Sequence, residues 1–236
     1  MKLNFENERV LGVVAHPDDA ELLCAGTLAR AKADGATIGI VIMAQGDKGQ
    51  TDPPIENLGE VRSGEMKAAA QLLGAELFEA GYGDGELFDT VESRRCLMEF
   101  FRQFRPTLVL AHSAEDYHSD HRAASAITDA ASWYCASPGH ITASPPMEQP
   151  PALWWMDTIE MIGFQPEVYI DISPFVDVKQ KMLHCHQSQL ARGGNSDFSP
   201  LEKIMTRQYQ ARGEQVGVKA AEAFRHAALW KRTRAW

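Results

Sequence analysis

Two short segments contain the residues best suited to chemistry. One is AHPDD at residues 15–19, with Glu21 two positions further on, and the other is HSDH at residues 118–121. Catalytic zinc sites use imidazole and carboxylate ligands, commonly three from the protein, and leave one position for water or substrate. Groups that do not bind the metal remain free for the proton transfers that metal-assisted amide cleavage requires. The two segments therefore predict a metal-dependent, zinc-type hydrolase that acts on an amide.

Each segment follows an apolar run that is typical of a buried strand. RVLGVVA at residues 9–15 leads into the first segment, and residues 107–111 come shortly before the second. In a doubly wound sheet of the commonest order, the first and fourth strands are neighbours, and their carboxyl ends open onto the crevice where ligands bind. We therefore expect two His/Asp clusters, far apart in sequence, to meet in one cleft.

The rest of the chain alternates short apolar runs with helix-period patterns, which indicates a parallel sheet covered on both faces. Further strands are predicted at residues 37–43, 76–78, 153–156 and 168–172. Helices are predicted at residues 21–33, 59–73, 91–104, 123–134, 175–189, 201–212 and 219–228. The predicted fold is an α/β, doubly wound, mostly parallel Rossmann-like sheet with helices on both faces, and residues 1–236 are expected to form a single domain.

Composition excludes several classes of protein. The net charge of −9 argues against a nucleic-acid partner, because binding to phosphate backbones requires a basic surface. No apolar run is long enough for a membrane span, and the charged N-terminus does not resemble a signal peptide. The four cysteines are scattered without a CxxC pair, which favours reduced thiols in a cytoplasmic protein.

Charge is distributed unevenly along the chain. Residues 201–236 hold eight Lys or Arg against three Glu, while the remainder is strongly acidic. The simplest interpretation is a solvated basic tail that lies against an acidic body. That body can belong to the same chain or to a neighbouring subunit. Together with the family resemblance described next, this asymmetry leads us to expect a homo-oligomer.

The pattern A-H-P-D-D-x-E followed by H-x-D-H resembles the PIG-L/LmbE-like family of zinc-dependent N-acetylglucosaminyl de-N-acetylases. The resemblance extends through nearly the whole chain. Less diagnostic matches occur at residues 26–29, 62–65, 84–87, 186–189 and 221–224. The sequence departs from the commoner pattern at Ser119, where proline is usual, and at residues 22–25, which are bulkier than the usual glycine-rich stretch. These departures leave the substrate open more than the catalysis.

The resemblance implies a metal site made by His16, Asp19 and His121. Zinc is the expected ion, although Fe²⁺ or another divalent metal suits the same ligands. Arg62 is implied to contact the polar substrate. An ion pair between Arg62 and Glu65 along one helix face is an equally good interpretation of that arginine.

Three further residues are implied to move protons and stabilise charge. Asp18 would be the general base that deprotonates the metal-bound water. His118 would be the charged group that stabilises the oxyanion, and Asp120 would orient His118 and keep it charged.

Each of these residues also has a structural interpretation. Asp18 or Asp19 could cap the helix that follows, and Glu21 suits the helix dipole. The remaining histidines are expected to be structural or at the surface: His112, His140, His184, His186 and His226.

The leading hypothesis is removal of an N-acetyl group from an amino-sugar-containing small molecule. An amidase that acts on a sugar-thiol conjugate would use the same site. His16-x-Asp18 with a distant His also matches the facial triad of ferrous oxygenases, although the α/β pattern counts against it. A nucleotide-binding module without catalysis would need a glycine-rich turn where HPDD stands. The loops at residues 45–58 and 137–151 are expected to shape the mouth of the cleft.

Overall fold

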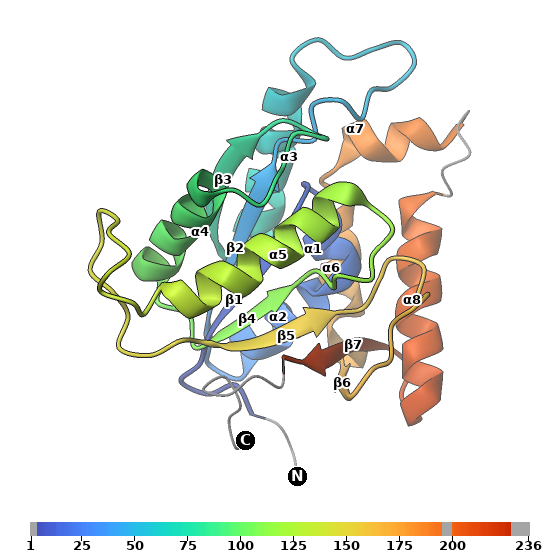
Figure 1. Cartoon of the computed structure of the whole chain (residues 1–236). Helices are drawn as coiled ribbons and strands as arrows, with labels where there is room; N and C mark the ends of the chain where they lie inside the picture. The colour runs from blue at the N-terminus through green and yellow to red at the C-terminus, as the bar shows by residue number, and fades with distance from the viewer. Residues whose placement is uncertain (1–3, 195–199, 228–236) are drawn as a thin grey trace.

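The computed structural model describes residues 4–194 and 200–227. Its strands form one sheet in the order β3-β2-β1-β4-β5-β7-β6 (Figure 1). Strands β1 to β5 pair in parallel, and β7 runs antiparallel to both of its neighbours. The strands are β1 Arg9–Val14, β2 Thr37–Ala44, β3 Glu76–Tyr82, β4 Leu108–Ala111, β5 Ala152–Met156, β6 Val168–Asp171 and β7 Ala221–His226.

Helices cover both faces of the sheet. The helices are α1 Asp19–Leu23, α2 Ala25–Ala33, α3 Leu58–Leu73, α4 Val91–Phe104, α5 Ser119–Tyr134, α6 Val176–Leu183, α7 Gln187–Leu190 and α8 Leu201–Val216, with 3₁₀ turns at Ser173–Phe175 and Ala191–Gly194. Apolar residues of α4 and α5 form one core with the sheet, and those of α1, α2, α3, α6 and α8 form the other. The predicted α/β fold, mostly parallel and covered on both faces, is confirmed.

Strand β1 shows why the central strands are apolar throughout. Val10 and Val14 belong to one core, whereas Leu11 and Val13 belong to the other, and all four are fully buried. Side chains alternate between the two faces of a strand, so a strand covered on both sides needs apolar residues at successive positions.

Strands β1 and β4 are neighbours, as the sequence predicts. Val10 pairs with Leu108 and Val13 with Ala111, so the carboxyl ends of both strands lie at the same edge. The chain connects outward in opposite directions from this pair, which makes it the switch point of the sheet.

The prediction of a helix at residues 219–228 is wrong. The described part of that range contains strand β7, and residue 228 lies outside the described residues. Alanine and glutamate favour a helix locally, but here β5 and β6 pair with β7 on both sides. Tertiary pairing has overridden the local preference.

Two other predicted helices are interrupted. The helix at residues 21–33 is divided at Cys24, whose φ and ψ of −145° and −1° are not helical. The helix at residues 175–189 ends at Leu183 and is followed by the short α7.

The described residues contain no helix that is long and apolar enough to cross a membrane. All four cysteines are free, and Cys24 and Cys135 are buried.

Candidate metal centre and catalytic cleft

The turn between β1 and α1 presents three polar side chains at the edge of the sheet. His16, Asp18 and Asp19 are all buried, with at most 8% of each residue exposed. Asp18 has a φ of 96°, in the left-handed region that residues with a Cβ rarely adopt. The backbone N–H of His16 donates to Asp19 Oδ2 over 2.8 Å, which fixes that carboxylate inside the turn. Strained backbone of this kind gathers at functional sites.

The Asp19 carboxylate lies at the centre of the cluster. Its Oδ2 atom is 3.4 Å from His16 Nδ1 and 3.3 Å from His121 Nε2. His121 comes from the first turn of α5, which follows β4. The two sequence segments therefore do converge, and the three residues implied as metal ligands lie around one oxygen atom.

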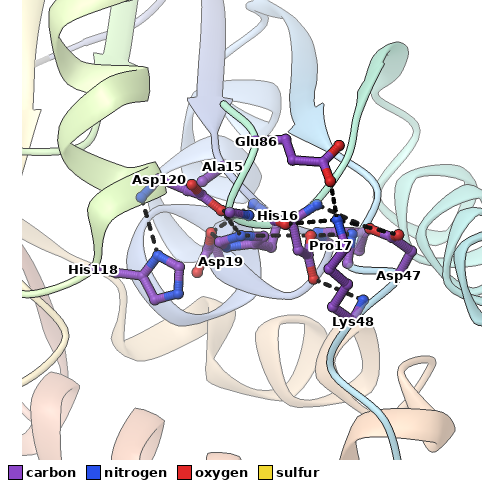
Figure 2. A network of polar contacts seen from close by, with 12 residues as sticks. Ala15, His16, Pro17, Asp19, Asp47, Lys48, Glu86, His118 and Asp120 are labelled. Carbon is purple, nitrogen blue, oxygen red and sulfur yellow. Dashed lines mark hydrogen bonds and ion pairs between the residues drawn. The ribbon is translucent and has the colours of Figure 1, made fainter. Parts of the chain in front are cut away.

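The outer ring nitrogens of both histidines face further carboxylates. His16 Nε2 is 3.1 Å from Asp120 Oδ2, and His121 Nδ1 is 3.0 Å from Asp116 Oδ1. Figure 2 shows His16 close to both Asp19 and Asp120. Histidines that bind metals typically contact a carboxylate or carbonyl through the nitrogen that does not bind the ion. The cluster therefore offers the imidazole and carboxylate donors that a divalent metal takes.

His112 lies inside the same cluster, so a surface position for it is excluded. It is fully buried, and its Nε2 atom is 3.4 Å from Asp19 Oδ2. That nitrogen also accepts a hydrogen bond from the backbone N–H of Ala15 over 3.0 Å. Asp19, His112 and His121 could by themselves hold an ion, as could His16, His118 and His121. Because the Nε2 lone pair of His112 is already engaged, His16 is the better ligand.

Burial and charge set the protonation of the three imidazoles. Burial lowers the pKa of His16, but hydrogen bonds with Asp120 and Asp19 outweigh it and raise the pKa to about 10. Burial also opposes the charged form of His121, yet the Asp19 charge and the contact with Asp116 raise its pKa to about 9. Burial and the nearby His121 lower the pKa of His112 to about 4. A divalent cation would displace the protons on His16 and His121 and balance the same carboxylates.

Arg62 binds Asp18 rather than Glu65. Its Nη2 atom is 3.0 Å from Asp18 Oδ2 and also contacts the carbonyl of Pro17. Glu65 instead accepts hydrogen bonds from the backbone N–H and hydroxyl of Ser188. Burial raises the pKa of Asp18, while the Arg62 charge opposes that rise. Arg62 is buried in the wall of the cleft, so it can both restrain Asp18 and face a substrate.

The Asp120 side chain was expected to contact His118, but its carboxylate contacts His16 instead. Its carboxylate also accepts from the backbone N–H of Gly85 over 2.8 Å, while only its own backbone N–H, 3.2 Å from Nδ1, holds His118. The expected charged state of His118 is not supported either. Burial and the charges of His121 and His16 lower the pKa of His118. A neutral His118 that accepts at Nδ1 carries its proton on Nε2 and can donate there.

A cavity of about 890 Å³ opens above the cluster. Its lining includes His16, Asp18, Asp19, Arg62, His118 and His121. The loop at residues 45–58 contributes Lys48 and Gly49, as expected. The loop at residues 137–151 contributes no residue, so its predicted role at the mouth is wrong. That loop follows the far end of α5, and a helix of this length carries the chain about 24 Å away from His118.

Sequence reasoning gave no role to two acidic residues that position the site. Asp84 accepts from the backbone N–H groups of Gly46 and Lys48 and lies 3.7 Å from His16 Nε2. Asp116 faces His121, as described above. No spacing rule connects either residue to its histidine. His112, in contrast, directly follows β4 and could have been found by the argument that selected His16.

Glu21 and His186 form a second buried pair next to the site. Both are 0% exposed, and Glu21 Oε1 lies 3.4 Å from His186 Nε2. The Glu21 charge raises the pKa of His186 despite its burial. The helix-dipole interpretation of Glu21 therefore omits its main partner.

Comparison with known proteins agrees with this geometry. The family model described as PIG-L, GlcNAc-PI de-N-acetylase, matches residues 11–132, just over half of the chain. A diacetylchitobiose deacetylase of Thermococcus kodakarensis is 26% identical over 230 residues, which cover 92% of this chain and 82% of that protein. A 4-oxalmesaconate hydratase of Pseudomonas putida is 24% identical over 196 residues, or 79% of this chain and 76% of the hydratase.

A solved structure shares the same fold. The N,N'-diacetylchitobiose deacetylase of Pyrococcus horikoshii superposes with a TM-score of 0.81 at 24% identity, over 93% of this chain and 83% of that one. The residues matched by the family model include both His/Asp segments that build the cluster. This chain belongs to the PIG-L family of de-N-acetylases.

Proposed function

We propose that this chain is a divalent-metal-dependent hydrolase that removes the N-acetyl group from an amino-sugar-containing molecule. The observation that carries the proposal is the arrangement of His16 and His121, each of which faces Asp19 with one nitrogen and a second carboxylate with the other. Relatives named as deacetylases of diacetylchitobiose and of 1D-myo-inositol 2-acetamido-2-deoxy-alpha-D-glucopyranoside support the substrate class.

In this proposal His16, Asp19 and His121 would hold the metal. When bound, such an ion polarises a carbonyl and lowers the pKa of water to about 7. Asp18 accepts the proton of the attacking water, and its raised pKa brings it closer to the neutral range in which a base works well. Arg62 keeps the Asp18 carboxylate oriented through the 3.0 Å contact.

His118 stabilises the negative charge that develops on the amide carbonyl oxygen. It lines the cavity, and its Nδ1 atom is engaged by the Asp120 backbone. The proton on Nε2 is then available to the oxygen as a fixed donor. A donor aimed at such an oxygen typically contributes about 10²–10³ in rate.

The direct test is release of free amine by the purified protein. Enzyme that has been stripped with a chelator and reloaded with Zn²⁺, Fe²⁺ or another divalent ion should act on a panel of N-acetylated amino sugars and sugar-thiol conjugates. Failure to release amine from every member with every metal would overturn the proposal. Hydration of 4-oxalmesaconate without amine release would instead favour the activity for which the Pseudomonas relative is named.

Three finer expectations stay predictions. Zinc as the resident metal can be checked by elemental analysis of the purified protein. A homo-oligomer can be checked by light scattering, and a cytoplasmic location by cell fractionation. The basic residues Lys231, Arg232 and Arg234, on which part of the charge argument rests, lie outside the described residues.

Asp120→Asn is expected to weaken metal binding by about 10–100-fold, the usual effect of losing a carboxylate behind a histidine ligand. The Asp120 carboxylate lies 3.1 Å from His16 Nε2 and fixes the ring with Nδ1 toward Asp19. Competition with a chromophoric chelator measures the affinity. Asp177→Asn, an exposed position on α6, is the matched control. An unchanged affinity in Asp120→Asn would contradict this role.

A further inference from the structure

Part of the cleft is apolar and has no place in the hydrolytic chemistry. We call Leu22, Ile159, Leu190, Leu201 and Ile204 the apolar wall; all five line the cavity that contains the His/Asp cluster. They come from α1, the loop after β5, α7 and α8. Figure 1 shows α7 and α8 on the opposite side of the molecule from α4.

The residues of the apolar wall belong to one core of the sheet or pack against it. Leu22, Ile159 and Ile204 are 4%, 5% and 8% exposed, and Leu190 and Leu201 are half-buried. The charged residues Lys48, Glu160 and Glu202 line the same cavity but are exposed, so they lie at its mouth. The cavity therefore combines the apolar wall with exposed charged residues and with Arg192, which is half-buried and donates to Gln189 over 2.8 Å.

The charged residues at the mouth already have protein partners. Lys48 is 2.6 Å from Glu86, and Glu160 is 2.5 Å from Arg207. Glu202 faces His184 at 3.7 Å. An ionic group on the substrate would have to compete with these contacts, so they give little support to a charged second part of the substrate.

The size of the cavity exceeds that of one amino sugar. At about 890 Å³ it lies near the upper end of the range of roughly 300–1,000 Å³ for pockets that bind drug-sized ligands. An N-acetylated hexosamine is smaller than such a ligand. Its hydroxyl groups would also lose hydrogen bonds to water against the apolar wall without replacement, which is unfavourable.

We propose that the substrate is an N-acetylated amino sugar with an uncharged, apolar aglycone, alkyl or aryl, that packs against the apolar wall. This inference rests on the proposed function, because it takes the N-acetylated sugar to be the part of the substrate that binds beside the His/Asp cluster. The sugar ring lies beside the His/Asp cluster and the aglycone extends toward α7 and α8. Leu190 and Leu201 then act as specificity determinants and take no part in the reaction.

The test compares matched glycosides of N-acetylglucosamine with the metal-loaded, full-length enzyme. The aglycones are methyl, propyl and hexyl, with 2,3-dihydroxypropyl as the polar counterpart of propyl. We expect kcat/KM to rise at least about tenfold from methyl to hexyl, since an apolar pocket discriminates by about 10–200-fold for each methylene it fully encloses. The dihydroxypropyl glycoside should fall below the propyl glycoside.

Variants connect this preference to the apolar wall. Leu201→Gln and Leu190→Gln should each lower the hexyl-to-methyl ratio by about threefold or more, because they replace apolar contact with an amide. Val216→Gln is the matched control on α8; it is 43% exposed and does not line the cavity, so its ratio should equal that of the wild type. Thermal unfolding shows whether each variant is folded, and the two wall positions provide independent readings.

The outcomes separate this inference from the proposed function. Amine release from all glycosides without preference, or with preference for the polar aglycone, overturns the apolar aglycone and leaves the deacetylase proposal standing. A hexyl preference that survives in both wall variants also overturns it. Absence of amine release from every glycoside overturns the proposed function and this inference with it.

Discussion

His121→Ala is expected to abolish both metal binding and amide hydrolysis. Of the three proposed ligands, His121 is the one that comes from α5. Its Nε2 atom lies 3.3 Å from Asp19 Oδ2. Its removal leaves two ligands on the β1–α1 turn. The loss of an ion that contributes several kcal/mol to the transition state should lower turnover by at least about 10³-fold. Elemental analysis and the amine-release assay measure the two effects.

Two companion variants make this prediction specific. His140→Ala removes an exposed imidazole in the loop at residues 137–151 and should leave both the metal and the turnover unchanged. Asp18→Asn should retain the metal yet lose about 10²–10⁴ in turnover, because it removes only the proposed base. Full turnover in His121→Ala would contradict the ligand assignment. Loss of the metal in Asp18→Asn would show that Asp18 is a ligand and not solely a base.

The convergence of the two segments could be predicted because it depends on local rules and on topology. His16 follows an apolar strand, and the adjacency of the first and fourth strands is the commonest arrangement in such sheets. The same logic applied to His112, the first residue after β4, would have placed it in the cluster. A single histidine after a strand is, however, more commonly a packing residue, so His112 alone gives a weak signal.

The finer partners of the site could not be predicted from spacing. Asp120 is one residue from His121, yet its carboxylate contacts His16, 104 positions earlier in the chain. A carboxylate in the first turn of a helix can face any of several neighbouring residues. Only the tertiary packing of α5 against β1 determines which residue Asp120 contacts. The partners of Asp84 and the pairing of Glu21 with His186 likewise follow only from tertiary structure.

Strand β7 shows a related limit. Its sequence, AEAFRH, has no alternation that distinguishes a strand from a helix. Phe224 joins one core, Ala227 just after the strand joins the other, and Glu222 is only 5% exposed. A buried glutamate is interpretable only with knowledge of its cation, which here lies on helix α6.

That cation is Lys179, and Lys179→Met is expected to destabilise the protein strongly. Lys179 is 0% exposed, and its Nζ atom is 2.6 Å from Glu222 Oε1 and 3.0 Å from the carbonyl of Leu22. Removal of one partner of a buried ion pair leaves an uncompensated charge, which typically costs about 3–5 kcal/mol of unfolding free energy. Urea unfolding followed by circular dichroism measures the loss.

Two further variants distinguish the ion pair from the simple loss of a lysine. Lys181→Met alters an exposed lysine of the same helix and should change the unfolding free energy by less than about 0.5 kcal/mol. Lys179→Met combined with Glu222→Gln removes both charges and should recover part of the loss, as a double-mutant cycle would reveal. Equal stability of Lys179→Met and the wild type would contradict the prediction.

The ion pair also connects stability to the site. Glu222 accepts from the backbone N–H groups of Gly26 and Thr27 over 2.9 Å and 2.7 Å, so it holds the start of α2. Lys179 holds the carbonyl of Leu22 in α1, the helix that begins at Asp19. Loss of Lys179 should therefore weaken metal binding together with stability, whereas Lys181→Met should affect neither. Destabilisation with unchanged metal affinity would show that the β1–α1 turn is fixed by His16 and its neighbours alone.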